Sequence, residues 1–147
     1  MQDRYYSVFQ NIVKETQDRH GYDLSFNIET YITMLLADHV EKTNFLPDDS
    51  FAESYLKLDS PYGVRAKQLG DTCLFTMGVF PTYGQRKGLT QEYFSNIGKS
   101  SYDLACDSLN DVLFLDLRNH FDFLTAFINT CVTNENKIKI RSFLDKN

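Results

Sequence analysis

The chain has 147 residues, 42% of them hydrophobic and 14% aromatic, which is enough to build one packed domain without a metal or a disulfide framework. Its formal net charge of −5 is unevenly spread, because residues 1–60 carry 5 basic against 11 acidic side chains, whereas residues 61–99 carry 5 against 2. A general nucleic-acid binder would show a larger basic excess, and no apolar run reaches the length of a membrane span, so we expect neither nucleic acid nor membrane as a partner.

The N-terminus and the cysteines indicate the compartment. The segment M-Q-D-R-Y-Y-S-V-F-Q lacks the basic and then apolar order of a signal peptide, so we expect a cytoplasmic protein. Cys73, Cys106 and Cys131 are odd in number and widely spaced, which predicts buried thiols rather than disulfides or a zinc site. The sequence contains no catalytic, metal-binding or phosphate-loop motif, and we therefore expect no catalytic residue, no metal and no cofactor.

Two amphipathic helices open the chain. Apolar side chains over residues 3–19 recur at three- and four-residue steps, and the His-Gly pair at 20–21 is typical of a helix end. Asn27 is the expected N-cap of the second helix, whose apolar stripe covers residues 28–40.

Capping patterns place the next two helices. Ser50 and Glu53 form a capping box for a short helix, and Pro61 stands where the first residue of another helix is expected. This other helix should end near Phe80, because Pro81 disfavours helical geometry in the residue before it.

The second half of the chain predicts two long helices and a terminal segment. Thr90 is the expected N-cap of a helix that runs to Leu109. Residues 111–131 are apolar over most of a helical circumference, which is typical of the central helix of a bundle. Residues 135–145 fit both strand and helix spacing, and we favour a terminal helix. The sequence thus predicts an all-α fold: a single domain over 1–147, with six or seven helices around the central helix.

Glycines at four-residue spacing indicate that two of these helices cross closely. This spacing puts the residues of each set on one helix face, where they form a notch. The two sets are Gly70, Leu74 and Gly78 on the first helix and Phe94, Gly98 and Tyr102 on the second. Each glycine costs a helix about 1 kcal/mol relative to alanine, and burial of one large side chain offsets this with roughly 1.5–3 kcal/mol. We expect a helix crossing; a ligand in the notch or a break in the helix is the alternative.

Asp71 stands among the apolar residues of the first of these helices. It shares a helix side with Leu74, so we expect it to be partly buried and to need hydrogen-bond partners. Lys67 lies one turn earlier, and Tyr83 and Tyr102 are candidates from elsewhere in the chain. We favour a structural hydrogen bond or a helix cap over a catalytic carboxylate.

The basic middle segment offers a candidate ligand site. Arg86 and Lys87 lie between Gly84 and Gly88, shortly before an expected helix start, and helix N-termini attract anions. We favour solvated loop cations, with a site for a small anionic compound as the alternative. The residues that would line such a site are Asp71, Tyr83, Arg86, Lys87, Tyr93 and Tyr102.

Two histidines have acidic neighbours in sequence. His39 lies on the apolar stripe of the second helix, either as a hydrogen-bonded boundary residue, which we favour, or as a metal ligand or base. Asp116 and His120 lie one helical turn apart, as a structural pair, which we favour, or as an orienting pair for acid–base chemistry.

Two stretches resemble a known family. The pattern L-G-D-x-x-L-F-x-x-G-x-F over residues 69–80, followed by Y-F-x-x-x-G-x-x-S-Y over residues 93–102, resembles an uncharacterised bacterial all-helical family. That family has a Leu-Gly-Asp…Gly-Phe-Phe…Tyr-Tyr…Met-Gly…Ala-Tyr pattern, from which this chain departs at Ile97 and at Val79 to Pro81. The resemblance implies an all-helical bacterial protein and implies no activity.

Two functions fit these observations. The one we favour is an intracellular helical interaction module that binds a protein partner or a second copy of itself as a homodimer, because strong core patterning occurs here without any catalytic constellation. The alternative is a small-ligand or enzymatic pocket for an anionic compound near Asp71 and Arg86.

Overall fold

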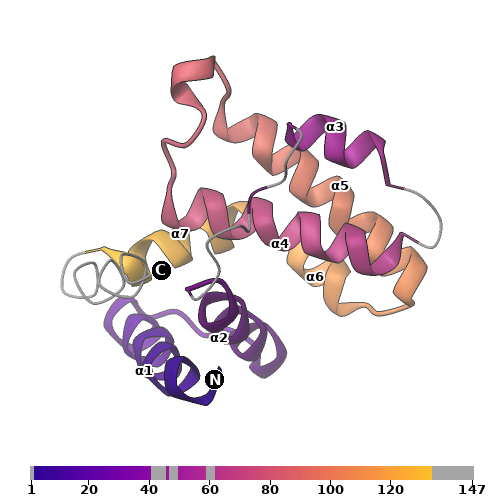
Figure 1. Ribbon diagram of the computed structural model, residues 1–147. Helices are drawn as coiled ribbons and strands as arrows, with labels where there is room; N and C mark the ends of the chain where they lie inside the picture. The colour runs from indigo at the N-terminus through magenta and orange to yellow at the C-terminus, as the bar shows by residue number, and fades with distance from the viewer. Residues whose placement is uncertain (1, 41–45, 47–49, 59–61, 134–147) are drawn as a thin grey trace.

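The computed structural model describes residues 2–40, 46, 50–58 and 62–133, and these residues form seven α-helices and one 3-10 turn, with no strand among them (Figure 1). In chain order the elements are α1 Gln2–His20, α2 Phe26–Val40, α3 Phe51–Leu56, α4 Gly63–Val79, η1 Gln85–Lys87, α5 Gln91–Leu109, α6 Leu113–Asn119 and α7 Phe121–Val132. The expectation of an all-α bundle of six or seven helices is confirmed. The expected terminal helix over 135–145 lies outside the described residues.

Helix α4 occupies the centre of the bundle. It packs most extensively against α5 and also contacts α7, α2 and α3. Figure 1 shows it between α5 above and the hairpin of α1 and α2 below. Twelve of its 17 residues are buried. The central position expected for residues 111–131 therefore belongs to α4.

The expected continuous helix over residues 111–131 is two helices with a break at His120. The backbone of His120 has φ −108° and ψ 15°, which lies in the bridge region rather than in the helical region. The break turns α7 relative to α6, so that Phe114 of α6 and Phe121 of α7 both reach the core. A straight helix that is apolar on all sides must be surrounded by protein, whereas two short helices can each bury one side.

Local capping explains where several helices begin and end. The hydroxyl of Ser50 accepts a hydrogen bond from the backbone N–H of Glu53 at 3.1 Å, and that of Thr90 accepts one from the N–H of Tyr93 at 3.1 Å. Both caps, the end of α1 at His20 and the end of α4 before residue 81 are confirmed.

The expected cap of α2 at Asn27 is wrong. The helix begins at Phe26, and the hydroxyl of Ser25 accepts from the N–H of Ile28 at 3.3 Å. Serine and asparagine both serve as N-caps, and the sequence S-F-N offers the two residues only two positions apart.

Helices α4 and α5 meet through glycines at three points, one of which is Gly63 against Leu109, and the other two belong to the expected crossing. A Cβ atom on Gly70 would lie 2.7 Å from Cε1 of Tyr102, so the tyrosine ring covers the helix backbone directly. A Cβ atom on Gly98 of α5 would lie 3.0 Å from Cβ of Cys73 in α4, and it would also overlap the ring of Phe121. Because both contacts require the absence of a side chain, the glycines fix how closely the two helices approach.

The third glycine of the expected crossing serves a different helix. A Cβ on Gly78 would lie 2.5 Å from Cγ2 of Ile128, so this notch receives α7 rather than α5. Leu74 is fully buried in the core. Phe94 packs edge-to-face against Phe51 of α3 at a centroid distance of 4.9 Å. The two predicted faces therefore meet only in part, because Gly78 contacts α7 and Phe94 contacts α3.

Candidate functional site

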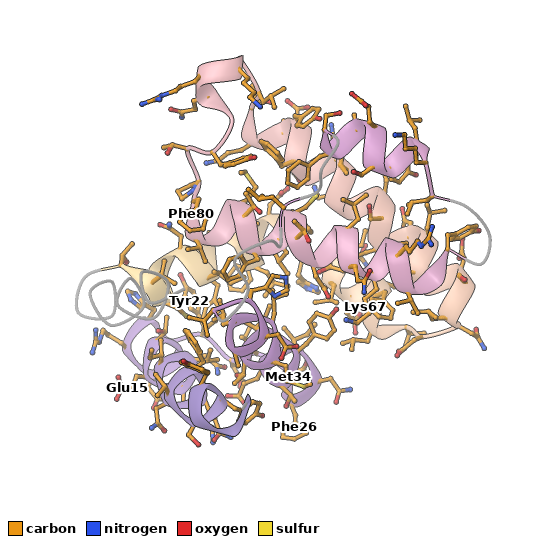
Figure 2. All side chains as sticks on the ribbon, in the orientation of Figure 1. Glu15, Tyr22, Phe26, Met34, Lys67 and Phe80 are labelled. Atoms are coloured by element: carbon orange, nitrogen blue, oxygen red, sulfur yellow. The ribbon has the colours of Figure 1, made fainter. Side chains whose placement is uncertain are left out.

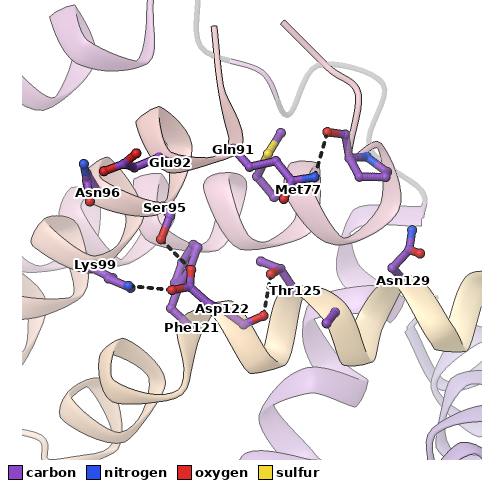
Figure 3. A pocket seen from close by; sticks show the side chains of 12 residues that line it. Met77, Gln91, Glu92, Ser95, Asn96, Lys99, Phe121, Asp122, Thr125 and Asn129 are labelled. Carbon is purple, nitrogen blue, oxygen red and sulfur yellow. Dashed lines mark hydrogen bonds and ion pairs between the residues drawn. The ribbon is translucent and has the colours of Figure 1, made fainter. Parts of the chain in front are cut away.

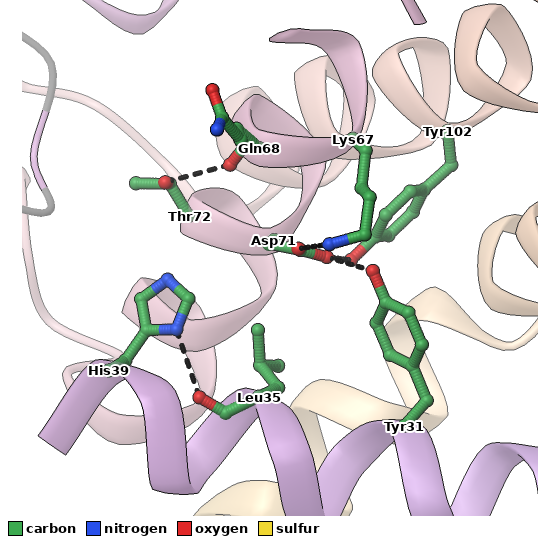
Figure 4. Close-up of polar contacts among 8 residues, drawn as sticks. All are labelled: Tyr31, Leu35, His39, Lys67, Gln68, Asp71, Thr72 and Tyr102. Atoms are coloured by element: carbon green, nitrogen blue, oxygen red, sulfur yellow. Dashed lines mark hydrogen bonds and ion pairs between the residues drawn. The ribbon is translucent and has the colours of Figure 1, made fainter. Parts of the chain in front are cut away.

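The carboxylate of Asp71 is buried where α2, α4 and α5 meet, with 5% of the residue exposed (Figure 4). Its Oδ1 accepts hydrogen bonds from the phenols of Tyr31 at 2.5 Å and Tyr102 at 2.8 Å, and its Oδ2 pairs with Nζ of Lys67 at 2.9 Å. Three protein groups therefore satisfy the carboxylate. A buried carboxylate with such partners ties helices together and has little capacity left for a ligand.

The two phenols act as hydrogen-bond donors to this carboxylate. Burial, together with the neighbouring Asp71 charge, raises the pKa of Tyr31 and of Tyr102 well above the usual range for tyrosine. Both hydroxyls consequently stay protonated at neutral pH and keep their donor role. Acid–base chemistry at this cluster is disfavoured, because neither phenol gives up its proton near neutrality.

Tyr83 and Tyr93 do not join this cluster. The hydroxyl of Tyr93 accepts a hydrogen bond from the backbone N–H of Ala52 at 3.1 Å and so holds α3 against α5. Tyr83 packs edge-to-face against Phe94 at a centroid distance of 5.8 Å. Both tyrosines stabilise the packing around α3.

Arg86 and Lys87 lie on the exposed 3-10 turn η1. The glycines on either side, Gly84 and Gly88, have φ of +88° and +75°, which shapes the turn. Backbone N–H groups of residues 85 and 87–89 donate to carbonyls within it and are not free to bind an anion. From Asp71, α4 continues for eight residues, about 12 Å of helix, before this loop begins. The structure therefore does not bring the buried carboxylate and the loop cations into one pocket.

The two histidines make local contacts to helix backbone. His39 is buried, its Nδ1 lies 2.9 Å from the carbonyl oxygen of Leu35, and its ring stacks on Phe75. Nδ1 of His120 lies 2.9 Å from the backbone carbonyl of Asp116 rather than from its carboxylate. In the part of the chain that the structure describes, no three His, Cys, Asp or Glu side chains gather as metal ligands would.

A groove of about 650 Å³ lies where α5, α7 and the C-terminal end of α4 meet (Figure 3). On α5 the lining residues recur every three or four positions and so occupy one side of the helix. They are Gln91, Glu92, Ser95, Asn96 and Lys99.

The opposite wall of the groove is α7, with the same spacing of lining residues. Met77 of α4 and Phe121 are buried and form an apolar base, and Pro81 closes the end next to α4. The residues from α7 are Phe121, Asp122, Thr125, Ala126 and Asn129. The groove thus combines an apolar base with walls rich in hydrogen-bonding groups, so its lining is more polar than that of a typical small-molecule pocket.

An ion pair joins the two walls at one end of the groove; we call Ser95, Lys99 and Asp122 the Asp122 cluster. Oδ1 of Asp122 accepts from the hydroxyl of Ser95 at 2.6 Å, and Oδ2 pairs with Nζ of Lys99 at 2.7 Å. Hydrogen bonds from Lys99 and then from Ser95 lower the pKa of Asp122. A carboxylate with a lowered pKa is a weak base, so this arrangement does not activate the serine as a nucleophile.

Two amides hold the end of the groove next to α4. Nε2 of Gln91 donates to the carbonyl oxygen of Pro81 at 3.3 Å, and Nδ2 of Asn129 donates to that of Gly78 at 3.1 Å. The carbonyl of Gly78 lies in the last turn of α4, where helix carbonyls lack partners within the helix. Asn129 therefore anchors α7 to α4 and orients its own amide at the edge of the groove.

The groove residues were not among the residues predicted from the sequence. Their only sequence signal is polar spacing on two separate helices, such as Ser95 with Lys99 and Asp122 with Thr125, and a solvated helix face has the same spacing. The pairing of these faces depends on the position of α7, which the break at His120 sets.

Comparison of the chain with protein-family models, with curated proteins and with solved structures found no match in any of the three. The resemblance to the bacterial helical family stays a prediction. None of the helices among the described residues is both long and apolar enough to cross a membrane.

Proposed function

We propose that this protein is a binding module whose groove between α5 and α7 holds an extended segment of a partner protein. The observation that carries the proposal is the composition of the groove, in which helices on both sides present amides, hydroxyls and charges above an apolar base. The Asp71 carboxylate, in contrast, has three protein partners. The groove, unlike the surroundings of Asp71, therefore has hydrogen-bonding groups available to a ligand.

Binding fits the groove better than catalysis does. In the groove, the hydroxyl of Ser95 donates a hydrogen bond to the carboxylate of Asp122. The pKa of Asp122 is lowered, so this carboxylate is a weak base and does not activate the serine. Lys99 is engaged in the ion pair with the same carboxylate, so its amine is not free to act as a nucleophile. These three groups fix the shape of one end of the groove.

The lining suits a polypeptide segment. Side-chain amides such as that of Asn96 carry both donors and an acceptor, as a peptide bond does, and so can pair with an extended backbone. Two exposed aromatic side chains that neighbour lining residues in sequence do not line the groove: Phe80, at the end of α4 (Figure 2), is 39% exposed and packs on Phe75, and Phe123 of α7 is 40% exposed and packs on Tyr22. The support for a polypeptide ligand is therefore the polar lining.

A peptide-display selection tests the proposal. Random peptides are selected against the folded protein and then compared on two variants that each add the same bulky side chain to an exposed helix position. Ala126→Trp fills the groove, whereas Asn11→Trp adds the ring on the solvent face of α1. Selected peptides should bind the wild type and Asn11→Trp alike and lose at least tenfold in affinity for Ala126→Trp.

Two results would count against the proposal. One is selected peptides that bind Ala126→Trp as well as they bind the wild type. The other is a chain that is monomeric in light scattering and enriches no peptide. A dimer that only Ala126→Trp dissociates would instead identify the partner as a second copy of this chain, and so would retain the groove as the binding site.

A further inference from the structure

The C-terminal end of α7 lies beside one end of the groove. Asn129, at the edge of the groove (Figure 3), lies one helical turn before Thr133, with which the described part of the chain ends. The backbone of Thr133 has φ −94° and ψ 173°, so the chain leaves α7 in an extended conformation. Residues 134–147, which we call the tail, follow in the sequence and lie outside the described residues. The tail therefore begins next to the groove.

The dimensions of the groove fit an extended chain better than a helix. Its two long walls run from residue 91 to 99 and from residue 121 to 129, which is about 12 Å of helix each. A volume of about 650 Å³ over this length gives a cross-section of roughly 50 Å². An extended chain occupies about 4.8 by 10 Å. A helix with its side chains is about 10–12 Å across and needs roughly twice this area.

The polar groups of the walls suit a peptide backbone. Gln91 and Asn129 each use one amide N–H for a backbone carbonyl, and among the described residues each keeps its second N–H and its amide oxygen for other partners. Lys99 keeps two of its three N–H groups beyond the ion pair with Asp122. The walls therefore offer donors and acceptors together, as a peptide backbone does.

The sequence K-I-K-I-R over residues 137–141 has the period of an extended chain. Ile138 and Ile140 fall on one side of such a chain, and the three cations fall on the other. The apolar base that Met77 and Phe121 form is the matching surface for two isoleucine side chains. Five extended residues cover about 16 Å, which is enough to follow the groove from end to end. The helix that the same residues also fit is too wide for the groove.

We propose that residues 137–141 of this chain occupy the groove, with Ile138 and Ile140 on its apolar base, and there compete with a partner segment. The proposal rests on the proposed function and adds the regulation of the same site. The chain has to reverse its direction after α7, and T-N-E-N over residues 133–136 contains two asparagines, which favour turns. A segment tethered so closely has an effective concentration in the millimolar range. An intrinsic affinity of only about 1 mM therefore fills the groove about half of the time.

Photo-crosslinking of the full chain tests where the tail lies. p-Benzoylphenylalanine is placed at Ile138 in one variant and at Lys139, on the opposite side of the extended chain, in the other. Mass spectrometry of the crosslinked monomer should join the probe at position 138 to Met77 at least fivefold more often than the probe at position 139. Equal crosslinking from both positions would overturn the proposal. Crosslinks to Met77 found only in a dimer would also overturn it, because the occupant would then be the tail of a second copy.

Two matched double variants of the full chain measure the regulation. Ile138→Ser with Ile140→Ser removes the apolar side of the tail, whereas Lys137→Ser with Lys139→Ser changes the side that faces away from the base. A display-selected peptide should bind the isoleucine variant at least threefold more tightly than the wild type, and the lysine variant like the wild type. A threefold gain means that the groove of the wild type is open in about one third of the molecules. An isoleucine variant that binds the peptide no better than the lysine variant would overturn the proposal.

Failure of this proposal is distinguishable from failure of the proposed function. If selected peptides lose affinity for Ala126→Trp but bind the wild type and both serine variants alike, the groove binds partner segments and the tail does not occupy it. If the probe at position 138 crosslinks to Met77 but Ala126→Trp weakens no selected peptide, the tail occupies the groove and the proposed function is the part that is wrong.

Discussion

Replacing Tyr31 with Phe removes one hydrogen bond from the buried Asp71 carboxylate and keeps the aromatic ring in place. The carboxylate retains Tyr102 and Lys67 as partners. A hydrogen bond to a charged group contributes about 1.5–3 kcal/mol, and we expect a loss near the lower end because two partners remain. A loss of about 2 kcal/mol in a chain of this length lowers the melting temperature by roughly 4–8 °C.

Urea unfolding followed by far-UV circular dichroism measures this loss. The matched control is Tyr55→Phe, because Tyr55 is half-buried and its hydroxyl has no partner within the described ranges. The control should change the unfolding free energy by less than about 0.5 kcal/mol. In a double-mutant cycle, Asp71→Asn should reduce the cost of Tyr31→Phe. If Tyr31→Phe costs no more than the control, the reasoning that Asp71 ties α2 to α4 is refuted.

Three further predictions concern the core, the thiols and the groove. Gly98→Ala should destabilise the protein by about 1–2 kcal/mol in thermal unfolding, because overlap with Phe121 outweighs the better helix propensity; an unchanged melting temperature would contradict the tight crossing. Burial raises the pKa of the Cys73 thiol, so an alkylating reagent should modify half-buried Cys106 before Cys73 in the native protein, as followed by mass spectrometry. Equal alkylation rates at Cys73 and Cys106 would contradict this burial. Hydrogen bonds from the lysine and the serine of the Asp122 cluster lower the pKa of Asp122, so the stabilisation they give is present above the unfolded pKa of this carboxyl group and disappears as the pH falls through the lowered folded pKa. Asp122→Asn should therefore lower the unfolding free energy by about 0.2–1 kcal/mol at neutral pH and leave it unchanged in strong acid. A loss that persists in acid would refute the ion pair as its source.

Local rules predicted the fold class and several helix ends from the sequence. Ser50 and Thr90 cap their helices because a short polar side chain reaches an N–H group three residues later, and that geometry needs no knowledge of the rest of the fold. The period of the apolar residues likewise depends only on the helix itself. These features are encoded within a few neighbouring residues.

Features that depend on how helices pack were missed or only half predicted. The sequence predicted that Asp71 needs hydrogen-bond partners, and it offered Lys67 and Tyr102, which both bind the carboxylate. It did not predict Tyr31, which is 40 residues away and reaches Asp71 only after α2 docks on α4. The break at His120 contains no proline or glycine that would have marked it in the sequence, and it lies next to Phe121, whose ring packs against Gly98.

The groove could not be predicted from the sequence, because its polar residues look the same as a solvated helix face. Ser95 and Asp122 are 27 residues apart and meet only because α7 turns back along α4. Their functional meaning depends on which donors and acceptors remain unused after the helices have packed. That balance is a property of the assembled fold.

Chemical-shift mapping with a display-selected peptide tests the central claim most directly. The account predicts that the largest shifts in backbone amides fall within residues 91–99 and 121–129, on the two walls of the groove. Shifts centred instead on Asp71 or on the loop from Gly84 to Gly88 would contradict it and would return the binding site to one of the candidates predicted from the sequence.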